Sequence, residues 1–457
     1  MFTLDEEFAD RVFSYCRERL ALNPVPLDFG SVRGLSVNHL DGCITPHGRP
    51  PDEVLDIFTR ELAEHVISTD SSKFLAFIPN APTKASLLFD MVVACSGLNG
   101  TSWLESAGAV VAENHTLEFL ATAAGMPPGS GGAFVSGGTI ANLSALTVAR
   151  DVGAARRPDS DRHRLCVAVS EESHSSISAA LHILGVDALV VPTTDHRLTR
   201  ADLESAMSND PRAQNVIAVV ATAGTTNAGI IDDLEGLGDY ARSHELWFHI
   251  DGAYGGAGIL SERLAPRLTG IRHADSFIVD PHKWLFAPLD CAGLIYREPH
   301  LARAVHTQHA GYLDILHAAP DTPEWNPSDY AIHLSRRPRG LALWFSLTTH
   351  GTNAYAAAID AGLDLAQYAA AVITDCPVTQ LLRTPELTNV VFSRDGWTAE
   401  DYQRWATSLL ERQIAFVAPS VWEGRACGRF SFLHPDIPRT VIDEIVATLV
   451  EPGPNER

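Results

Sequence analysis

The chain has 457 residues, of which 46% are hydrophobic and 20% are charged, a balance typical of a folded globular protein and too apolar for a disordered one. Its 56 acidic and 34 basic residues give a formal net charge of −22, so we expect no nucleic acid and no anionic membrane as a partner. No uninterrupted apolar run reaches the about 18 residues of a membrane span, and the N-terminus lacks the basic start of a signal peptide. Seven scattered cysteines without a CxxC motif predict reduced thiols and a cytoplasmic protein without structural zinc.

A chain of this length normally divides its core, so we expect one large domain with smaller ones beside it. Residues 1–70 predict a helical arm that docks on another part of the molecule or on a second subunit. Residues 71–340 hold the main run of predicted elements, and residues 341–457 predict a smaller C-terminal domain of helices and strands.

The large domain shows seven short, apolar runs in chain order, which we predict as buried strands: 133–136, 165–170, 189–192, 216–221, 246–250, 276–279 and 292–296. Helical patterns near 139–150, 174–184, 199–208 and 232–244 separate most of them. This alternation predicts an α/β fold with a mainly parallel sheet that carries helices on both faces. Because such sheets bind ligands at the carboxyl ends of their strands, the residues after each strand are the candidates for function.

Two motifs follow the first two predicted strands. The turn Ser136-Gly-Gly-Thr139 precedes a helix, where backbone amides and the helix N-terminus could hold a phosphate; the alternative is an ordinary turn capped by Thr139. His174 stands at the next helix start, where its ring could stack on a flat ligand; the alternative is a histidine that only caps the helix.

Three more motifs follow later strands. The turn 222–227 is rich in hydroxyl groups. Asp251 ends a buried strand, where a carboxylate needs a cation such as a protonated ring nitrogen; the alternative is a metal bound with His249, although no third ligand is evident. Lys283 follows another buried strand, where it could be a Schiff-base nucleophile or a lysine paired with a carboxylate.

Taken together, these motifs predict a phosphate-binding turn, a side chain that stacks on a flat ring, a charge partner for a ring nitrogen and an amine nucleophile. All four are expected at one edge of one sheet. Pyridoxal 5'-phosphate requires all four. The sequence therefore predicts this cofactor, and no metal.

The segments Asp280-Pro-His-Lys283-Trp-Leu, His249-Ile-Asp251-Gly-Ala-Tyr and Ser136-Gly-Gly-Thr resemble the group II pyridoxal-phosphate-dependent decarboxylases, which include the aromatic L-amino-acid and glutamate decarboxylases. The resemblance extends from about Ser71 to the segment 335–344 and more faintly beyond. It implies the fold type I architecture, with a seven-stranded sheet in the large domain. It also implies a homodimer with shared active sites and a mobile loop over roughly 312–335.

The resemblance implies eight cofactor-binding residues: Gly138, Thr139, His174, Thr226, Asp251, Ala253, His282 and Lys283. Lys283 is then the lysine that condenses with the cofactor aldehyde, and Asp251 keeps the pyridine nitrogen protonated. His174 and Ala253 pack on the two faces of the ring. The phosphate is held by the glycine turn and His282, and Thr226 lies near the ring hydroxyl or the substrate carboxylate.

The implied activity is the decarboxylation of an L-amino acid to an amine and CO2, with Lys283, His174 and Tyr330 as catalytic residues. Tyr330 stands in the Asp-Tyr context of the proton-donating tyrosine in the aromatic branch, but ungapped counting from the Arg336-Arg337 pair places Pro327 there. If no hydroxyl reaches the reacting carbon, the alternative is decarboxylation coupled to oxidative deamination, which yields an aldehyde, ammonia and peroxide.

Further alternatives concern substrate and class. Asn80 and Thr101 stand where aromatic decarboxylases carry other pocket residues, which favours a polar or conjugated amino acid as substrate. An aminotransferase would need an arginine for the substrate carboxylate, for which Arg429 is the candidate. A non-catalytic scaffold is disfavoured because Lys283, Asp251 and His174 occur together.

Overall fold

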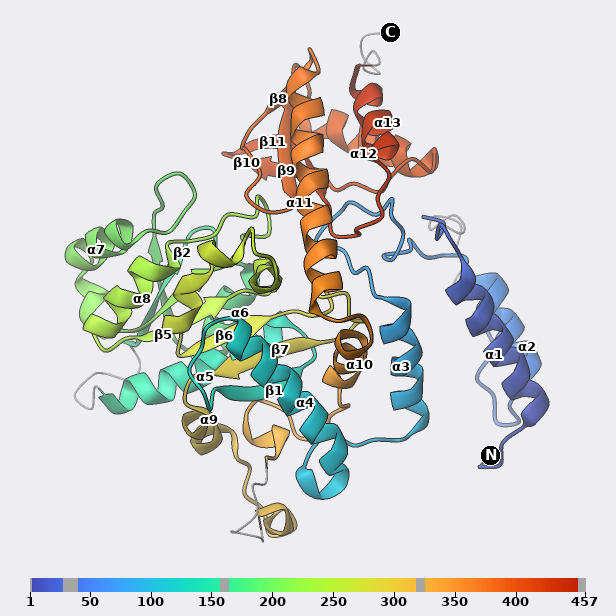
Figure 1. Ribbon diagram of the computed structural model, residues 1–457, viewed down its shortest axis with the longest axis horizontal. Coiled ribbons are helices and arrows are strands. Elements are labelled where there is room, and N and C mark those ends of the chain that lie inside the picture. Colours follow the sequence, from blue (N-terminus) through green and yellow to red (C-terminus); the bar gives the residue numbers. More distant parts are fainter. Residues whose placement is uncertain (1, 28–39, 157–163, 318–324, 451–457) are drawn as a thin grey trace.

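A seven-stranded sheet lies at the centre of the molecule (Figure 1). The structure is a computed structural model, and it describes residues 2–27, 40–156, 164–317 and 325–450. The part of the predicted loop at 318–324 lies outside these residues. The strands are β1 (Gly131–Val135), β2 (Cys166–Ser170), β3 (Asp187–Val191), β4 (Val216–Thr222), β5 (Trp247–Asp251), β6 (Ser276–Val279) and β7 (Ala292–Tyr296).

The strands lie in the order β1-β7-β6-β5-β4-β2-β3. From β6 to β3 the neighbours pair in parallel, whereas β7 runs antiparallel to both β6 and β1. Every residue of β1, β2, β4, β5, β6 and β7 is buried, because helices cover both faces and leave no side of these strands to water. The predicted α/β fold with a mainly parallel sheet is confirmed.

Two layers of helices enclose this sheet (Figure 1). One hydrophobic core lies under α5 (Gly138–Arg156), α6 (Ser175–Leu184) and α9 (Pro299–His306). The core on the opposite face lies under α4 (Trp103–Ala123), α7 (Arg200–Asn209), α8 (Leu234–Ser243) and α10 (Gly340–His350). Helix α3 (Lys84–Cys95) packs beside α10.

A second, smaller sheet of four antiparallel strands lies toward the C-terminus, in the order β10-β11-β9-β8. Its strands are β8 (Thr379–Leu381), β9 (Asn389–Arg394), β10 (Ser420–Trp422) and β11 (Arg425–Ser431). The helices α12 (Ala399–Glu411) and α13 (Arg439–Val450) pack on it and share a third hydrophobic core. This is the small α+β unit that the sequence predicts.

Helix α11 (Thr352–Asp375) joins the two sheets. Its first half places Tyr355 and Ile359 in the core of the large sheet, and its second half places Ala369 and Ile373 in the core of the small sheet. Although α11 is long and apolar enough to cross a membrane, its apolar side chains are used in these two cores. Leu75 also packs in the small-sheet core, so the predicted bounds 71–340 and 341–457 stay predictions.

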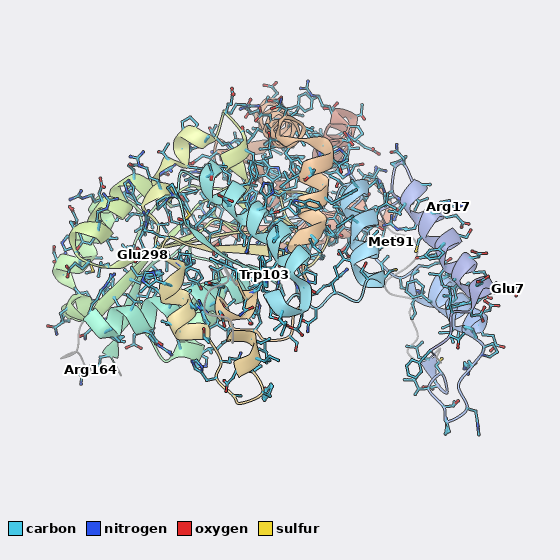
Figure 2. The ribbon with its side chains drawn as sticks, turned by 60° about the horizontal axis from the view of Figure 1, so that its bottom comes forward. Glu7, Arg17, Met91, Trp103, Arg164 and Glu298 are labelled. Atoms are coloured by element: carbon cyan, nitrogen blue, oxygen red, sulfur yellow. The ribbon has the colours of Figure 1, made fainter. Side chains whose placement is uncertain are left out.

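The N-terminal arm consists of α1 (Glu6–Ala21) and α2 (Pro51–Ile57), which lie beside the main body in Figures 1 and 2. Ion pairs join the two helices, since the guanidinium of Arg11 lies 2.6 Å from Asp52 and 2.8 Å from Asp56. None of the residues of α1 or α2 is buried. The helical arm is therefore present, and its outer surface is open to contact with another molecule.

Candidate active site

A cavity of about 310 Å3 opens at the carboxyl ends of the strands of the large sheet. Its volume is at the lower end of the range of small-molecule sites, which is about 300–1,000 Å3. The following residues line it: Gly137, Gly138, Thr139, Asn142, His174, Ser176, Thr222, Gly224, Thr226, Asp251, Ala253, Tyr254, Asp280, His282 and Lys283. All eight residues predicted to bind the cofactor are among them, so the structure brings them together at one cavity.

The glycine turn after β1 is tightly packed. The N–H group of Gly138 donates to a carboxylate oxygen of Asp280 at 3.3 Å. A Cβ atom at Gly138 would lie 2.9 Å from that oxygen and 3.3 Å from the Cβ of Ala253, so a side chain there would force Asp280 to shift. Because α5 begins here, the positive end of its helix dipole lies at the cavity wall, an arrangement that suits a phosphate group.

His174 both caps α6 and lines the cavity. Its Nδ1 accepts hydrogen bonds from the backbone N–H of Ser176 at 3.2 Å and from the hydroxyl of the same residue at 2.8 Å. The residue is nevertheless exposed, so a face of the ring is available to a flat ligand. The two interpretations of this histidine are therefore compatible, because capping the helix holds the ring at the cavity.

Asp251 ends β5 inside the cavity and is 5% exposed. One carboxylate oxygen accepts from the side-chain amide of Asn142 at 2.9 Å, and the other accepts from the backbone N–H of Ala253 at 3.1 Å. A buried carboxylate is stable only beside donors or a cation, and a protonated ring nitrogen would supply the cation. The predicted metal alternative fails at His249, since one of its ring nitrogens bonds Asn142 at 2.9 Å and the other Ser276 at 2.8 Å.

Lys283 lies beside a buried carboxylate. Its Nζ is 2.9 Å from Asp280, whose side chain is 1% exposed. Burial lowers the pKa of Lys283, but the charge and the hydrogen bond of Asp280 outweigh burial, so the net pKa is raised. The lysine that we predict as the nucleophile is thus also a lysine paired with a carboxylate.

Tyr330 is the predicted catalytic residue that the structure does not bring to this cavity. Its side chain is 4% exposed and stacks on Trp325, with ring centroids 4.1 Å apart and planes at 14°. Burial raises its pKa to about 12. Since Tyr330 lies in a hydrophobic core rather than at the cavity of its own chain, its role in proton transfer stays a prediction.

Three residues that the sequence connects with substrate choice also lie outside the cavity lining. The Asn80 amide donates to the backbone carbonyls of His282 and Ala287, and the Thr101 hydroxyl lies 2.6 Å from Oδ1 of Asn99 and 3.0 Å from the carbonyl oxygen of Leu334. The polar groups of Asn80 and Thr101 are therefore bonded within this chain and do not by themselves support a polar substrate.

The third of these residues, Arg429, carries the aminotransferase alternative. Its guanidinium donates to the backbone carbonyls of Phe77, Thr226 and Asn227 at 2.8, 2.5 and 3.0 Å. Burial lowers its pKa to about 10. These bonds hold the turn that carries Thr226, and they leave the guanidinium occupied with backbone rather than directed at a substrate carboxylate.

The site also contains residues that sequence reasoning missed, above all Asn142, Ser176 and Asp280. Asn142 follows Thr139 by three residues on α5, a spacing that places both on one face of the helix. Asp280 belongs to the lysine motif itself, but its contact with Gly138 requires knowledge of the strand order, since 142 residues separate the two.

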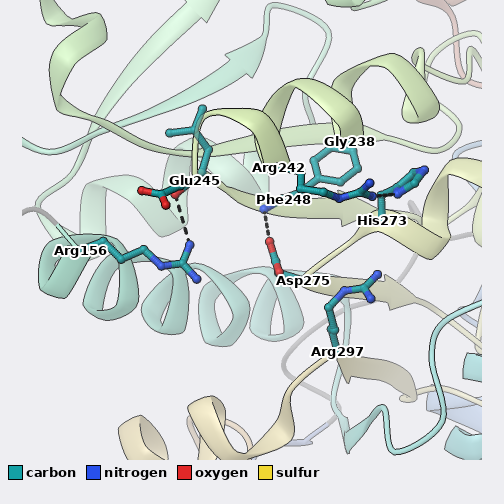
Figure 3. Close-up of a pocket in the computed structure, with 9 residues that line it drawn as sticks. Arg156, Gly238, Arg242, Glu245, Phe248, His273, Asp275 and Arg297 are labelled. Carbon is teal, nitrogen blue, oxygen red and sulfur yellow. Dashed lines mark hydrogen bonds between the residues drawn. The ribbon is translucent and has the colours of Figure 1, made fainter.

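A second cavity, of about 470 Å3, lies at the opposite edge of the sheet, near the starts of β5 and β6 (Figure 3). It is lined by Arg156 and Arg297, but each donates to backbone: Arg156 to the carbonyl of Glu245 at 3.2 Å, and Arg297 to that of Ala274 at 3.0 Å. None of the predicted site residues lines it, so its greater volume does not make it the better candidate.

Comparison with known proteins identifies the family. The model of the pyridoxal-dependent decarboxylase conserved domain matches residues 40–395. The chain belongs to the pyridoxal-dependent decarboxylase family. The aromatic-L-amino-acid decarboxylase of Bacillus atrophaeus is 32% identical over 360 residues, which cover 78% of this chain and 74% of that protein. The L-2,4-diaminobutyrate decarboxylase of Rhizobium meliloti is 29% identical over 410 residues, which cover 86% and 81%.

One relative carries a different name, the 4-hydroxyphenylacetaldehyde synthase of Rhodiola rosea, 28% identical over 322 residues, covering 67% of this chain and 64% of that protein. Among solved structures, the Oryza sativa TDC with PLP and tryptamine superposes with a TM-score of 0.88 at 22% identity, over 97% of both chains, and shares the fold. The protein is thus a pyridoxal-phosphate-dependent amino-acid decarboxylase.

Proposed function

We propose that the cavity at the strand ends is the site at which this decarboxylase removes the α-carboxyl group of an L-amino acid. One observation carries the proposal: Lys283, Asp251, His174 and the glycine turn, which come from four separate parts of the sequence, line a single cavity. The residues suit pyridoxal phosphate, because glycine at position 138 keeps the turn close to Asp280 and the buried Asp251 lacks a cation of its own at hydrogen-bond distance among the residues described.

When bound, pyridoxal phosphate supplies an electron sink for the pair left by the departing carboxylate. In this chain Lys283 provides the amine that attaches the cofactor. Asp251 would hold a proton on the ring nitrogen, because two donors fix its carboxylate at the cavity wall. His174 provides a flat surface for the ring, and the glycine turn with His282 binds the phosphate.

The proposal is tested by a substrate panel and by chemical trapping. Purified protein with pyridoxal phosphate is given aromatic L-amino acids and L-2,4-diaminobutyrate, the side-chain classes in the names of its relatives. We expect release of CO2 without uptake of O2, and borohydride reduction should label Lys283. The Lys283→Ala variant is the matched control. Label on another lysine, or no absorbance change with the cofactor, would contradict the proposal.

A second candidate is decarboxylation coupled to oxidative deamination. It is favoured by the burial of Tyr330, which leaves the cavity of its own chain without that hydroxyl, and by the name of the Rhodiola rosea relative. In the same panel it would show O2 uptake and ammonia release matched to CO2. The majority of the relatives named above are decarboxylases, which supports the first candidate.

We further propose a homodimer with shared active sites. Apolar side chains are exposed on the arm and on α3, among them Phe13, Val54, Phe58, Leu88 and Val92, each at least 43% exposed. Burial of such surface against a second copy would be favourable. Light scattering should give twice the chain mass.

Sharing of the sites is tested by mixing two inactive variants, Lys283→Ala and Tyr330→Phe. Recovery of activity on mixing is expected if Tyr330 serves the partner's cavity, and its absence would contradict that role. The proposed cytoplasmic location is supported by the seven cysteines, which are scattered along the chain and form no CxxC motif. Fractionation of the source cells would test it.

A further inference from the structure

A hydrogen-bonded chain of buried side chains leads from Asp251 at the cavity wall into the interior of the protein. The side-chain amide nitrogen of Asn142 lies 2.9 Å from Asp251 and 2.9 Å from the hydroxyl of Ser176. The amide oxygen of Asn142 lies 2.9 Å from Nε2 of His249. Asn142 is 1% exposed and His249 is fully buried, so water does not compete for these bonds.

The direction of each bond follows from the chemistry of its partners. An ionised carboxylate only accepts, so the amide nitrogen must face Asp251 and the amide oxygen must face His249. Since that oxygen accepts, Nε2 of His249 carries a proton. Burial lowers the pKa of His249, against the opposing charge of Asp251, so the ring is neutral and its Nδ1 is an acceptor.

The chain continues beyond His249. The hydroxyl of Ser276 lies 2.8 Å from Nδ1 of His249 and must donate to it. The same hydroxyl accepts from the indole N–H of Trp247 at 2.8 Å. The donors therefore point in one direction, from Trp247 through Ser276, His249 and Asn142 to Asp251.

A branch of this chain reaches His174. The second N–H of the Asn142 amide donates to Ser176, so the Ser176 hydroxyl directs its own proton to Nδ1 of His174 at 2.8 Å. Nδ1 of His174 is thus an acceptor, and its proton in the neutral ring is on Nε2. Asn142 connects the two residues that would hold the ring nitrogen and one face of the cofactor ring.

We propose that Asn142 and His249 are positioning residues of this decarboxylase, which hold Asp251 as an oriented anion and His174 in one tautomer before the cofactor binds. This inference rests on the proposed function. Without Asn142, the Asp251 carboxylate would lose a donor in a buried place and could rotate, and Nε2–H of His249 would lose its acceptor. The other charged or titratable groups that line this cavity are Tyr254, which follows β5, and Asp280, His282 and Lys283, which follow β6.

The test is a double-mutant cycle read by the dissociation constant of pyridoxal phosphate, followed by absorbance with the full-length protein. The variants are Asn142→Leu, His249→Leu and the double variant, with gel filtration and circular dichroism to confirm folding. Ser144→Ala, a buried change on the same helix that does not line the cavity, is the matched control. Should His249→Leu not fold, Ser276→Ala interrupts the same chain with the loss of one hydroxyl; Asn142→Ala likewise replaces Asn142→Leu.

We expect Asn142→Leu to weaken cofactor binding about tenfold or more, as loss of a hydrogen bond to a charged group would. His249 acts on the carboxylate through Asn142, so His249→Leu should weaken binding in the wild-type background and change it less than about twofold in the Asn142→Leu background. The pH at which the absorbance of the bound cofactor changes should shift in Asn142→Leu, which a packing defect would not produce.

Two results would overturn the inference. One is wild-type affinity in Asn142→Leu; the other is an undiminished effect of His249→Leu in the double variant, because additive effects indicate independent packing. Failure of the wild-type protein to bind pyridoxal phosphate would instead remove the proposed function, and the inference with it. The wild-type titration thus separates the two cases.

Discussion

The ion pair between Lys283 and Asp280 predicts how readily the cofactor attaches. The charged atoms are 2.9 Å apart, and the carboxylate is 1% exposed. At this separation Coulomb attraction is about 6 kcal/mol with an effective dielectric constant of about 20, partly offset by desolvation of the two groups. Only the neutral amine condenses with an aldehyde, so this attraction opposes attachment.

The perturbation is Asp280→Asn, which keeps the shape of the side chain and removes its charge. Without this counter-ion, burial still lowers the pKa of Lys283, and only the charge of Asp251 is left to oppose it. Because about 1.4 kcal/mol corresponds to a factor of ten, a quarter of the Coulomb attraction suffices for a tenfold faster condensation at neutral pH. The whole pH profile of condensation should move to lower pH.

The assay is stopped-flow absorbance at saturating cofactor over a range of pH. Pyridoxal, which lacks the phosphate, serves as a second probe, so that an effect on Lys283 is separated from an effect on the glycine turn beside Asp280. The control is Asp290→Asn: Asp290 is ten residues away, 45% exposed in its side chain and paired with Arg339. Superimposable pH profiles for wild type and Asp280→Asn would refute the reasoning.

Three further changes test other parts of the structure. Arg336→Met should lower the free energy of unfolding, measured in urea at one protein concentration, by about 3–5 kcal/mol. The change removes the cation that contacts the buried Glu113 carboxylate at 2.6 and 2.7 Å. A loss below about 1 kcal/mol would contradict this. Gly138→Ala should weaken binding of pyridoxal phosphate about tenfold or more with little change in folding. The new Cβ would lie 2.9 Å from Asp280, so the turn that is proposed to bind the phosphate would have to shift. Unchanged affinity in a titration would count against this phosphate site. Leu75→Ala should lower the free energy of unfolding by about 2–5 kcal/mol, because this fully buried side chain packs in the small-sheet core. A urea denaturation curve that matches wild type would exclude that packing role.

The sequence predicts the strands well because their burial on both faces leaves continuous apolar runs. Two of the predicted ranges, 276–279 and 292–296, coincide with β6 and β7, and the bounds of the other strands differ by at most two residues. The antiparallel direction of β7 is not encoded in such a run, because apolar residues alone do not record which neighbour a strand pairs with.

The grouping at the cavity was predictable where residues lie at the end of a strand or shortly after it, as Asp251 and Lys283 do, since the topology brings such positions to one edge. It was not predictable where a contact depends on how helices pack. Asn142 lies in the interior of a helix, and its bonds to Asp251 and His249 span more than a hundred residues of sequence. Tyr330 shows the converse, because its sequence context gives no sign that the ring stacks on Trp325.

Helix α11 has a mechanical consequence. One half of α11 is buried in the core of the large sheet and the other half in the core of the small sheet. Unfolding of either sheet would therefore expose apolar side chains of the same helix to water. The large and the small sheet should therefore unfold together in one cooperative transition. A fragment that ends before α11 would expose the apolar surface that Tyr355 and Ile359 cover in the large-sheet core.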